Sequence, residues 1–123
     1  MMRLILKATG IEHTNAIDTY VGSRLRELEK VLDPKEKSCI ARVEIAKETK
    51  HHKTGVDVYK AELTMRTGKK DFRVTATDES DLYAAIDAMK DHIVRDIKEH
   101  RDRSRKLQKD GDRKVKKVLR AMK

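Results

Sequence analysis

The feature that most constrains the fold is the order in which two apolar periodicities follow one another along the chain. In three segments between residues 38 and 76, apolar side chains recur at every second position, as in half-buried strands. In residues 17–32 and 82–97 they recur every three or four positions, as in amphipathic helices. The apolar run in residues 3–8 predicts one more strand. The predicted order is therefore strand, helix, three strands, helix.

This order predicts an α+β domain with a four-stranded mixed sheet and two helices packed on one face. A helical crossover normally joins parallel strands, so we expect the first two strands to be parallel. The turn at residues 67–70 contains Gly68, which predicts a hairpin between the third and fourth strands. Each helix has one apolar side to bury, and one face of the sheet can cover both.

Local signals predict where the two helices begin and end. Thr14 is a candidate N-cap for the first helix, and Asp33-Pro34 ends it, because the residue before a proline is pushed out of the helical region. Carboxylates in residues 78–81 favour the start of the second helix. We expect that helix to reach about Arg105 and residues 109–112, Lys-Asp-Gly-Asp, to interrupt any helix beyond it.

The positive charge is concentrated near the C-terminus. Residues 1–97 hold 18 basic and 17 acidic side chains, whereas residues 98–123 hold 12 basic and 4 acidic ones. This asymmetry favours a polyanionic partner, nucleic acid first, over a tail that only aids solubility. We therefore divide the chain into a domain of residues 1–105 and a basic, flexible tail of residues 106–123, whose short apolar repeat would become helical only on a partner.

Composition excludes several other classes of protein. The lone Cys39 cannot form an internal disulfide or a cysteine zinc clamp, and its strand position predicts a small buried side chain. No segment has the roughly 18 to 20 apolar residues of a membrane span, so we expect a cytoplasmic protein. Three tyrosines, one phenylalanine and no tryptophan offer few platforms for base stacking. An amphipathic helix at the C-terminus, for an anionic membrane or a protein groove, is a weaker alternative.

Basic side chains on the two predicted helices form a candidate phosphate-binding surface. Those of the first helix are Arg24, Arg26 and Lys30, and those of the second are Arg95, Lys98, Arg101 and Arg105. The second set recurs at intervals of three, three and four residues, which places it on one stripe away from the apolar side. The alternative is an ordinary solvated helix face, because Asp96, Glu99 and Asp102 can neutralise part of the stripe.

Candidate catalytic and metal-ligating residues have simpler structural explanations. The carboxylates around the start of the second helix are Asp78, Glu79, Asp81, Asp87 and Asp91. They suit capping and dipole compensation better than a magnesium-dependent nuclease, although a nuclease stays an alternative. His13 and the adjacent His51-His52 lack the spacing of a metal site. We expect no enzyme, no cofactor and no small-molecule substrate.

The segment Asp81-Leu82-Tyr83-Ala84-Ala85-Ile86-Asp87 resembles a signature of the ribosome hibernation-promoting factor and ribosome-associated inhibitor family, usually with methionine where Leu82 stands. The likeness extends over residues 14–33, with Leu28-Glu29-Lys30 in the first helix, and over Arg95 and the basic residues after it. It covers about residues 2–105. The resemblance implies a fold similar to a double-stranded-RNA-binding domain with an additional first strand.

The resemblance also implies a function. Such proteins bind the small ribosomal subunit and its rRNA in the channel used by tRNA and mRNA, and they inhibit translation during stress or stationary phase. Arg24, Lys30, Arg95 and Arg103 match basic positions of the family and look like rRNA contacts, whereas His92 and Glu99 depart from it. The sequence leaves open the oligomeric state and whether residues 106–123 pair ribosomes or prevent pairing. A free double-stranded-RNA-binding module is the alternative function.

Overall fold

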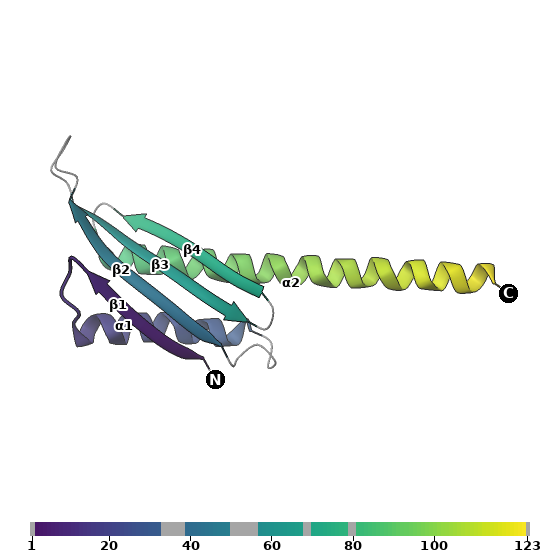
Figure 1. The fold of residues 1–123 in the computed structure, drawn as a ribbon, viewed down its shortest axis with the longest axis horizontal. Coiled ribbons are helices and arrows are strands. Elements are labelled where there is room, and N and C mark those ends of the chain that lie inside the picture. Colours follow the sequence, from purple (N-terminus) through teal and green to yellow (C-terminus); the bar gives the residue numbers. More distant parts are fainter. Residues whose placement is uncertain (1, 33–38, 50–56, 68–69, 79–80, 123) are drawn as a thin grey trace.

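The computed structural model describes residues 2–32, 39–49, 57–67, 70–78 and 81–122. Its elements are β1 (Arg3–Thr9), α1 (Asn15–Arg26), the 3-10 turn η1 (Glu27–Lys30), β2 (Ile40–Thr49), β3 (Asp57–Thr67), β4 (Lys70–Asp78) and α2 (Leu82–Ala121). This is the predicted order of strand, helix, three strands and helix (Figure 1).

The four strands form one mixed sheet in the order β1-β2-β3-β4. β1 pairs with β2 in parallel, with Leu6 opposite Val43, as expected for two strands joined through a helix. β2 with β3 and β3 with β4 are antiparallel, and Leu63 is the common partner of Val43 and Val74. The predicted mixed sheet is confirmed.

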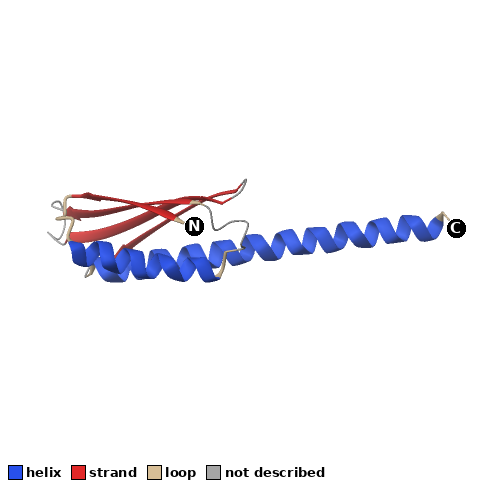
Figure 2. Ribbon diagram, turned by 90° about the horizontal axis from the view of Figure 1, so that it is seen from below, coloured by secondary structure: helices blue, strands red, loops and turns tan. Residues whose placement is uncertain are grey.

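Both helices cover the same face of this sheet, and the other face is open (Figure 2). Alternate side chains of the central strands point into the layer between sheet and helices, where Ile45, Leu63 and Met65 are buried. α1 contributes Ile17, Val21 and Leu25, and α2 contributes Leu82, Ala85, Ile86, Met89, Ile93 and Ile97. Cys39 is also buried in this core, as its position in the alternation predicted.

The first helix ends differently from the prediction. Thr14 is its N-cap and accepts a hydrogen bond from the backbone N–H of Ile17 at 3.3 Å, as expected. The regular α-helix ends at Arg26, however, and the chain continues as η1, a tighter turn of the kind that often finishes an α-helix. η1 keeps Leu28 fully buried in the core. The predicted stop signal Asp33-Pro34 lies outside the described residues.

The prediction that the second helix stops near Arg105 is wrong, because α2 continues without interruption to Ala121. Gly111 in a helix costs only about 1 kcal/mol relative to alanine, and most residues around it are good helix formers. The packed part of α2 also supplies the nucleus, so each further residue only has to propagate the helix. Whether residues 106–123 behave as a flexible tail stays a prediction.

α2 is far longer than the domain that it packs on. At about 1.5 Å per residue its 40 residues span about 60 Å, and its C-terminal half extends beyond the sheet into solvent (Figure 1). Ile97 is its last buried residue. Neither α2 nor any shorter helix within the described ranges combines the length and the apolar character that crossing a membrane requires.

Candidate nucleic-acid interface

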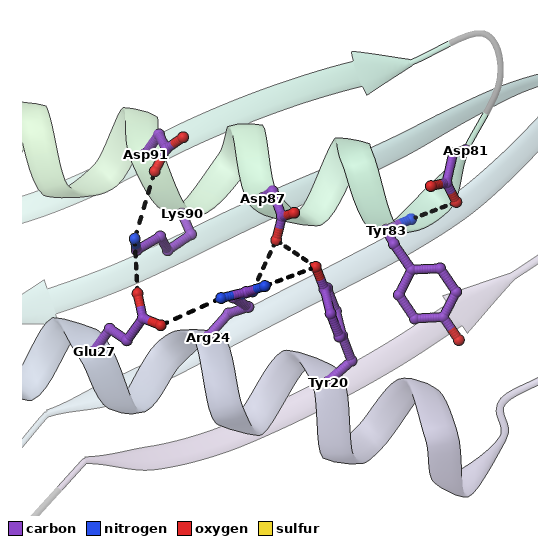
Figure 3. Close-up of polar contacts among 8 residues, drawn as sticks. All are labelled: Tyr20, Arg24, Glu27, Asp81, Tyr83, Asp87, Lys90 and Asp91. Carbon is purple, nitrogen blue, oxygen red and sulfur yellow. Dashed lines mark hydrogen bonds and ion pairs between the residues drawn. The ribbon is translucent and has the colours of Figure 1, made fainter.

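A polar network fixes α1 against α2 (Figure 3). The hydroxyl of Tyr20 donates to Asp87 Oδ1 at 2.7 Å, and Arg24 Nε lies 2.9 Å from the same oxygen. Arg24 also donates to the Tyr20 hydroxyl at 3.2 Å and to Glu27 Oε1 at 3.3 Å. One turn further along both helices, Lys90 Nζ lies 2.7 Å from Glu27 Oε2. The two helices therefore run side by side in the same direction, with a defined register.

The contacts shift the pKa values of their members in the direction that preserves the network. The hydrogen bond to Asp87 is the main cause of the raised pKa of Tyr20, and the hydrogen bond to Tyr20 raises the pKa of Arg24. The hydrogen bond between Lys90 and Glu27 lowers the pKa of Glu27 and raises that of Lys90. Arg24, Glu27 and Lys90 are thus charged, and Tyr20 is neutral, throughout the physiological pH range.

Six of the eight predicted phosphate contacts are exposed, and five of them lie on the side of the helices away from the sheet. We call Arg26, Lys30, Arg95, Lys98 and Arg105 the outer helix surface. The three α2 members fall within about 80° of one another around the helix at roughly 100° per residue. The contact of Glu27 with Lys90 places the start of η1, the turn that carries Lys30, beside α2. Asp102, also exposed, falls in the same sector of α2 and offsets one of these charges.

The other predicted cations lie elsewhere. Arg24 directs its guanidinium at Asp87, Glu27 and Tyr20, so its contacts in this structure are with protein. Arg101 is half-buried. Neither Arg24 nor Arg101 belongs to the outer helix surface, and their role as RNA contacts stays a prediction.

Arg103 lies on the side of α2 that faces β4. It lines a shallow hollow of about 320 Å³ together with residues 70–73 of β4 and with His100, which packs edge-on against Phe72 at 5.7 Å between ring centroids. Arg103 Nη2 is 3.7 Å from Glu99 Oε2, and Asp96 also lines the hollow. Charges of both signs therefore mix around Arg103, which makes this side a poorer phosphate site than the outer helix surface.

The carboxylates near the start of α2 make structural contacts. Asp78 accepts a hydrogen bond from the backbone N–H of Asp81, and Asp81 is the N-cap that accepts from the N–H of Tyr83 (Figure 3). Asp87 belongs to the network with Arg24, and Asp91 is 3.5 Å from Lys90. Glu79 lies outside the described residues. This arrangement is the capping and pairing that the sequence favoured over a catalytic cluster.

Of the candidate metal-ligating histidines, the structure describes His13. Within the described ranges no three His, Cys, Asp or Glu side chains are arranged to hold a metal ion. His13 contacts Asp18 at the start of α1. His51-His52 lies outside the described residues.

Sequence reasoning missed two groups of residues. Tyr20 lies within the periodic segment of residues 17–32 and was not singled out there, although its hydroxyl joins the two helices. The cations after Arg105 were assigned to a tail without fixed geometry, because a helix break was expected at residues 109–112. Their charge was visible in the sequence, but their common direction depends on the continuity of α2.

Comparison with known proteins agrees with the architecture. A crystal structure of the N-terminal domain of Protein Y from Thermus thermophilus matches with a TM-score of 0.66 and 27% identity, covering 80% of this chain and 99% of that one. A ribosomal subunit interface protein from Coxiella burnetii matches with a TM-score of 0.63 and 8% identity, covering 83% of this chain and 99% of that one, which shows a shared fold. No curated protein matches the chain.

The family model described as Sigma 54 modulation protein / S30EA ribosomal protein matches residues 4–105. The match includes β1, both helical segments that pair through Arg24 and Asp87, and the α2 signature around Tyr83. It ends where α2 leaves the domain. The chain therefore belongs to the Sigma 54 modulation protein / S30EA ribosomal protein family, the family that its sequence resembled.

Proposed function

We propose that the protein is a non-catalytic factor that binds the small ribosomal subunit through its rRNA, occupies the channel for tRNA and mRNA, and thereby inhibits translation in the cytoplasm during stress. Membership of a family described as S30EA ribosomal protein supports a ribosomal partner. So does the likeness to a protein described as a ribosomal subunit interface protein. The observation that carries the proposal is the outer helix surface.

The chemistry of this surface suits a folded RNA. Its five cations project from two helices that the Arg24–Asp87 and Lys90–Glu27 contacts hold in register, so their spacing is set before binding. Lysine and arginine side chains held in this way neutralise phosphates and release counterions, and this gives affinity that falls steeply with salt. Phosphate contacts position a protein without reading sequence, which is sufficient for a factor that acts by blocking a passage.

Co-sedimentation with purified small subunits tests the proposal. Lys30→Glu/Arg95→Glu/Lys98→Glu changes three exposed residues of the outer helix surface and should abolish co-sedimentation at about 0.1 M salt. The matched control, Arg3→Glu/Lys7→Glu/Arg42→Glu, makes the same charge change at exposed positions on the open face of the sheet and should retain it. Equal loss in both variants would show that net charge alone drives binding.

A free double-stranded-RNA-binding module is distinguished by a second arm of the same experiment. Asp78 and Asp81 lie at the start of α2 and would repel a phosphate backbone approaching there. We therefore expect the protein to prefer small subunits to naked duplex RNA. Equal affinity for the two would favour the free module.

A further inference from the structure

The last turns of α2 form a surface that the domain does not use. Beyond Ile97 the helix has no fully buried residue, and Leu107 and Met122 are 72% and 78% exposed. The family match ends at residue 105, so residues 106–121 of α2 are an addition to the shared domain. Because α2 is a continuous helix here, the position of each side chain around its axis is defined.

A row of cations and an apolar stripe lie on different sides of this helix, and Lys106, Lys114 and Lys117 lie between them on one flank. The row of cations, which we call the distal row, consists of Arg105, Lys109, Arg113, Lys116 and Arg120. At roughly 100° and 1.5 Å per residue, the row covers about 80° of the circumference and about 22 Å of length. The two aspartates of this segment, Asp110 and Asp112, fall outside that sector.

The apolar side chains of the same segment lie on the other side of the helix. They are Leu107, Val115, Val118, Leu119 and Met122, all exposed. They cover about 120° of the circumference, centred roughly 140° from the distal row. This apolar stripe continues the direction in which Ile86 and Ile93 pack on the sheet, so the distal row points away from the sheet side of α2.

The cations of the distal row are not held in ion pairs in the described part of the chain, although Asp102 lies in the same sector of α2. A row of unpaired cations along a rigid axis raises the local potential and attracts a polyanion more strongly than scattered charges do. It also continues the outer helix surface, because Arg95, Lys98 and Arg105 occupy the same side of α2.

We propose that residues 105–120 are a second RNA-binding element, in which the distal row lies along the phosphate backbone of an RNA duplex. The apolar stripe then faces away from the RNA. This inference extends the proposed function, because rRNA supplies such duplexes on a ribosome, but it rests on the distal row and not on the outer helix surface. An anionic membrane would instead have to take up the apolar stripe, which is the opposite geometry.

The test measures binding of the full-length protein to an RNA duplex of about 20 base pairs, by fluorescence anisotropy between about 50 and 200 mM salt. Lys109→Gln/Arg113→Gln/Lys116→Gln removes three cations of the distal row and keeps good helix formers. The matched control is Arg3→Gln/Lys7→Gln/Arg42→Gln on the open sheet face. The distal variant should bind about 10- to 100-fold more weakly near 0.1 M salt, and its slope of log affinity against log salt should be shallower by about 2 to 3. The control should retain most of the wild-type affinity and most of the wild-type salt dependence.

Other outcomes would overturn the inference. Equal losses in the two variants would mean that only net charge matters. A loss of duplex binding in Val118→Gln/Leu119→Gln, with none in the distal variant, would show that the apolar stripe makes the contact. Binding to vesicles of phosphatidylserine and phosphatidylcholine that depends on the distal row and exceeds binding to the duplex would identify a membrane as the partner.

A parallel arm with small ribosomal subunits separates this inference from the proposed function. If the distal row controls duplex binding but small subunits are not bound, the inference stands and the proposed function fails. The opposite result is that small subunits are bound through Lys30, Arg95 and Lys98, while the distal variant binds both the duplex and the small subunits as wild type does. In that case the inference fails and the proposed function stands.

Discussion

Removing the Asp87 carboxylate should loosen α1 from α2 by a measurable amount. In Asp87→Ala, the Tyr20 hydroxyl loses its acceptor at 2.7 Å and Arg24 Nε loses its ion pair at 2.9 Å. A hydrogen bond of this kind contributes about 0.5–1.5 kcal/mol, and an ion pair this exposed about 0.2–1 kcal/mol. Both contacts end on the same carboxylate oxygen, so their contributions are not fully additive. The free energy of unfolding should therefore fall by about 1–2 kcal/mol in total.

Urea unfolding followed by circular dichroism measures this loss. With an m-value of about 1–3 kcal/mol/M, Asp87→Ala should lower the midpoint by roughly 0.3–2 M. The control is Asp91→Ala one turn later on α2, where the carboxylate is 72% exposed and 3.5 Å from Lys90, and the expected loss is below about 0.5 kcal/mol. A double-mutant cycle with Arg24→Ala should give a coupling energy of about 0.5–1 kcal/mol. Equal midpoints for the two aspartate variants, or no coupling to Arg24, would refute the assignment of this network as the link between the helices.

Three further predictions test other parts of the structure. Gly111→Ala should favour the helix by about 0.5–1 kcal/mol, because a Cβ there meets no atom within 4 Å, so the signal at 222 nm should fall less on heating than in wild type; a steeper loss than in wild type would contradict a continuous α2. Gly10→Ala should destabilise the fold by about 1–3 kcal/mol in urea unfolding, because Gly10 has φ +69° and the new Cβ would lie 2.8 Å from the carbonyl oxygen of Lys47; wild-type stability would argue against this backbone. The lowered pKa of Glu27 means that its stabilisation by Lys90 is present above the unfolded pKa, near 4.5, and is lost as pH falls through the lower folded value. Between about pH 5 and pH 3 the urea midpoint should therefore fall more in wild type than in Glu27→Gln, and parallel curves would contradict the pairing.

The sequence was sufficient for the sheet and its topology because those follow from periodicity. The alternation that ends at Ala76 identified the strands, and the helical crossover required β1 and β2 to be parallel. The apolar stripe from Leu82 to Ile97 identified the side of α2 that packs on the sheet. Each of these conclusions depends on which side of an element is apolar, and that property can be read from the sequence.

Part of the candidate interface could not be predicted, because it depends on how the helices are placed against each other. Arg24 and Arg26 are both cations near the end of α1, yet only the register of α1 against Asp87 turns Arg24 toward protein. Arg103 was named because it matches a basic position of the family, but its position around the helix directs it toward β4. The distal row was missed for another reason, since Gly111 was treated as a helix break when its cost is small beside the stability of the packed helix.

The central claim is that the outer helix surface seats the protein where tRNA and mRNA bind. The most direct measurement follows labelled tRNA bound to small subunits programmed with mRNA, as wild-type protein and Lys30→Glu/Arg95→Glu/Lys98→Glu are added in separate titrations. Wild-type protein should release the tRNA, and the variant should leave it in place. Small subunits that carry wild-type protein and their full complement of tRNA at the same time would contradict it.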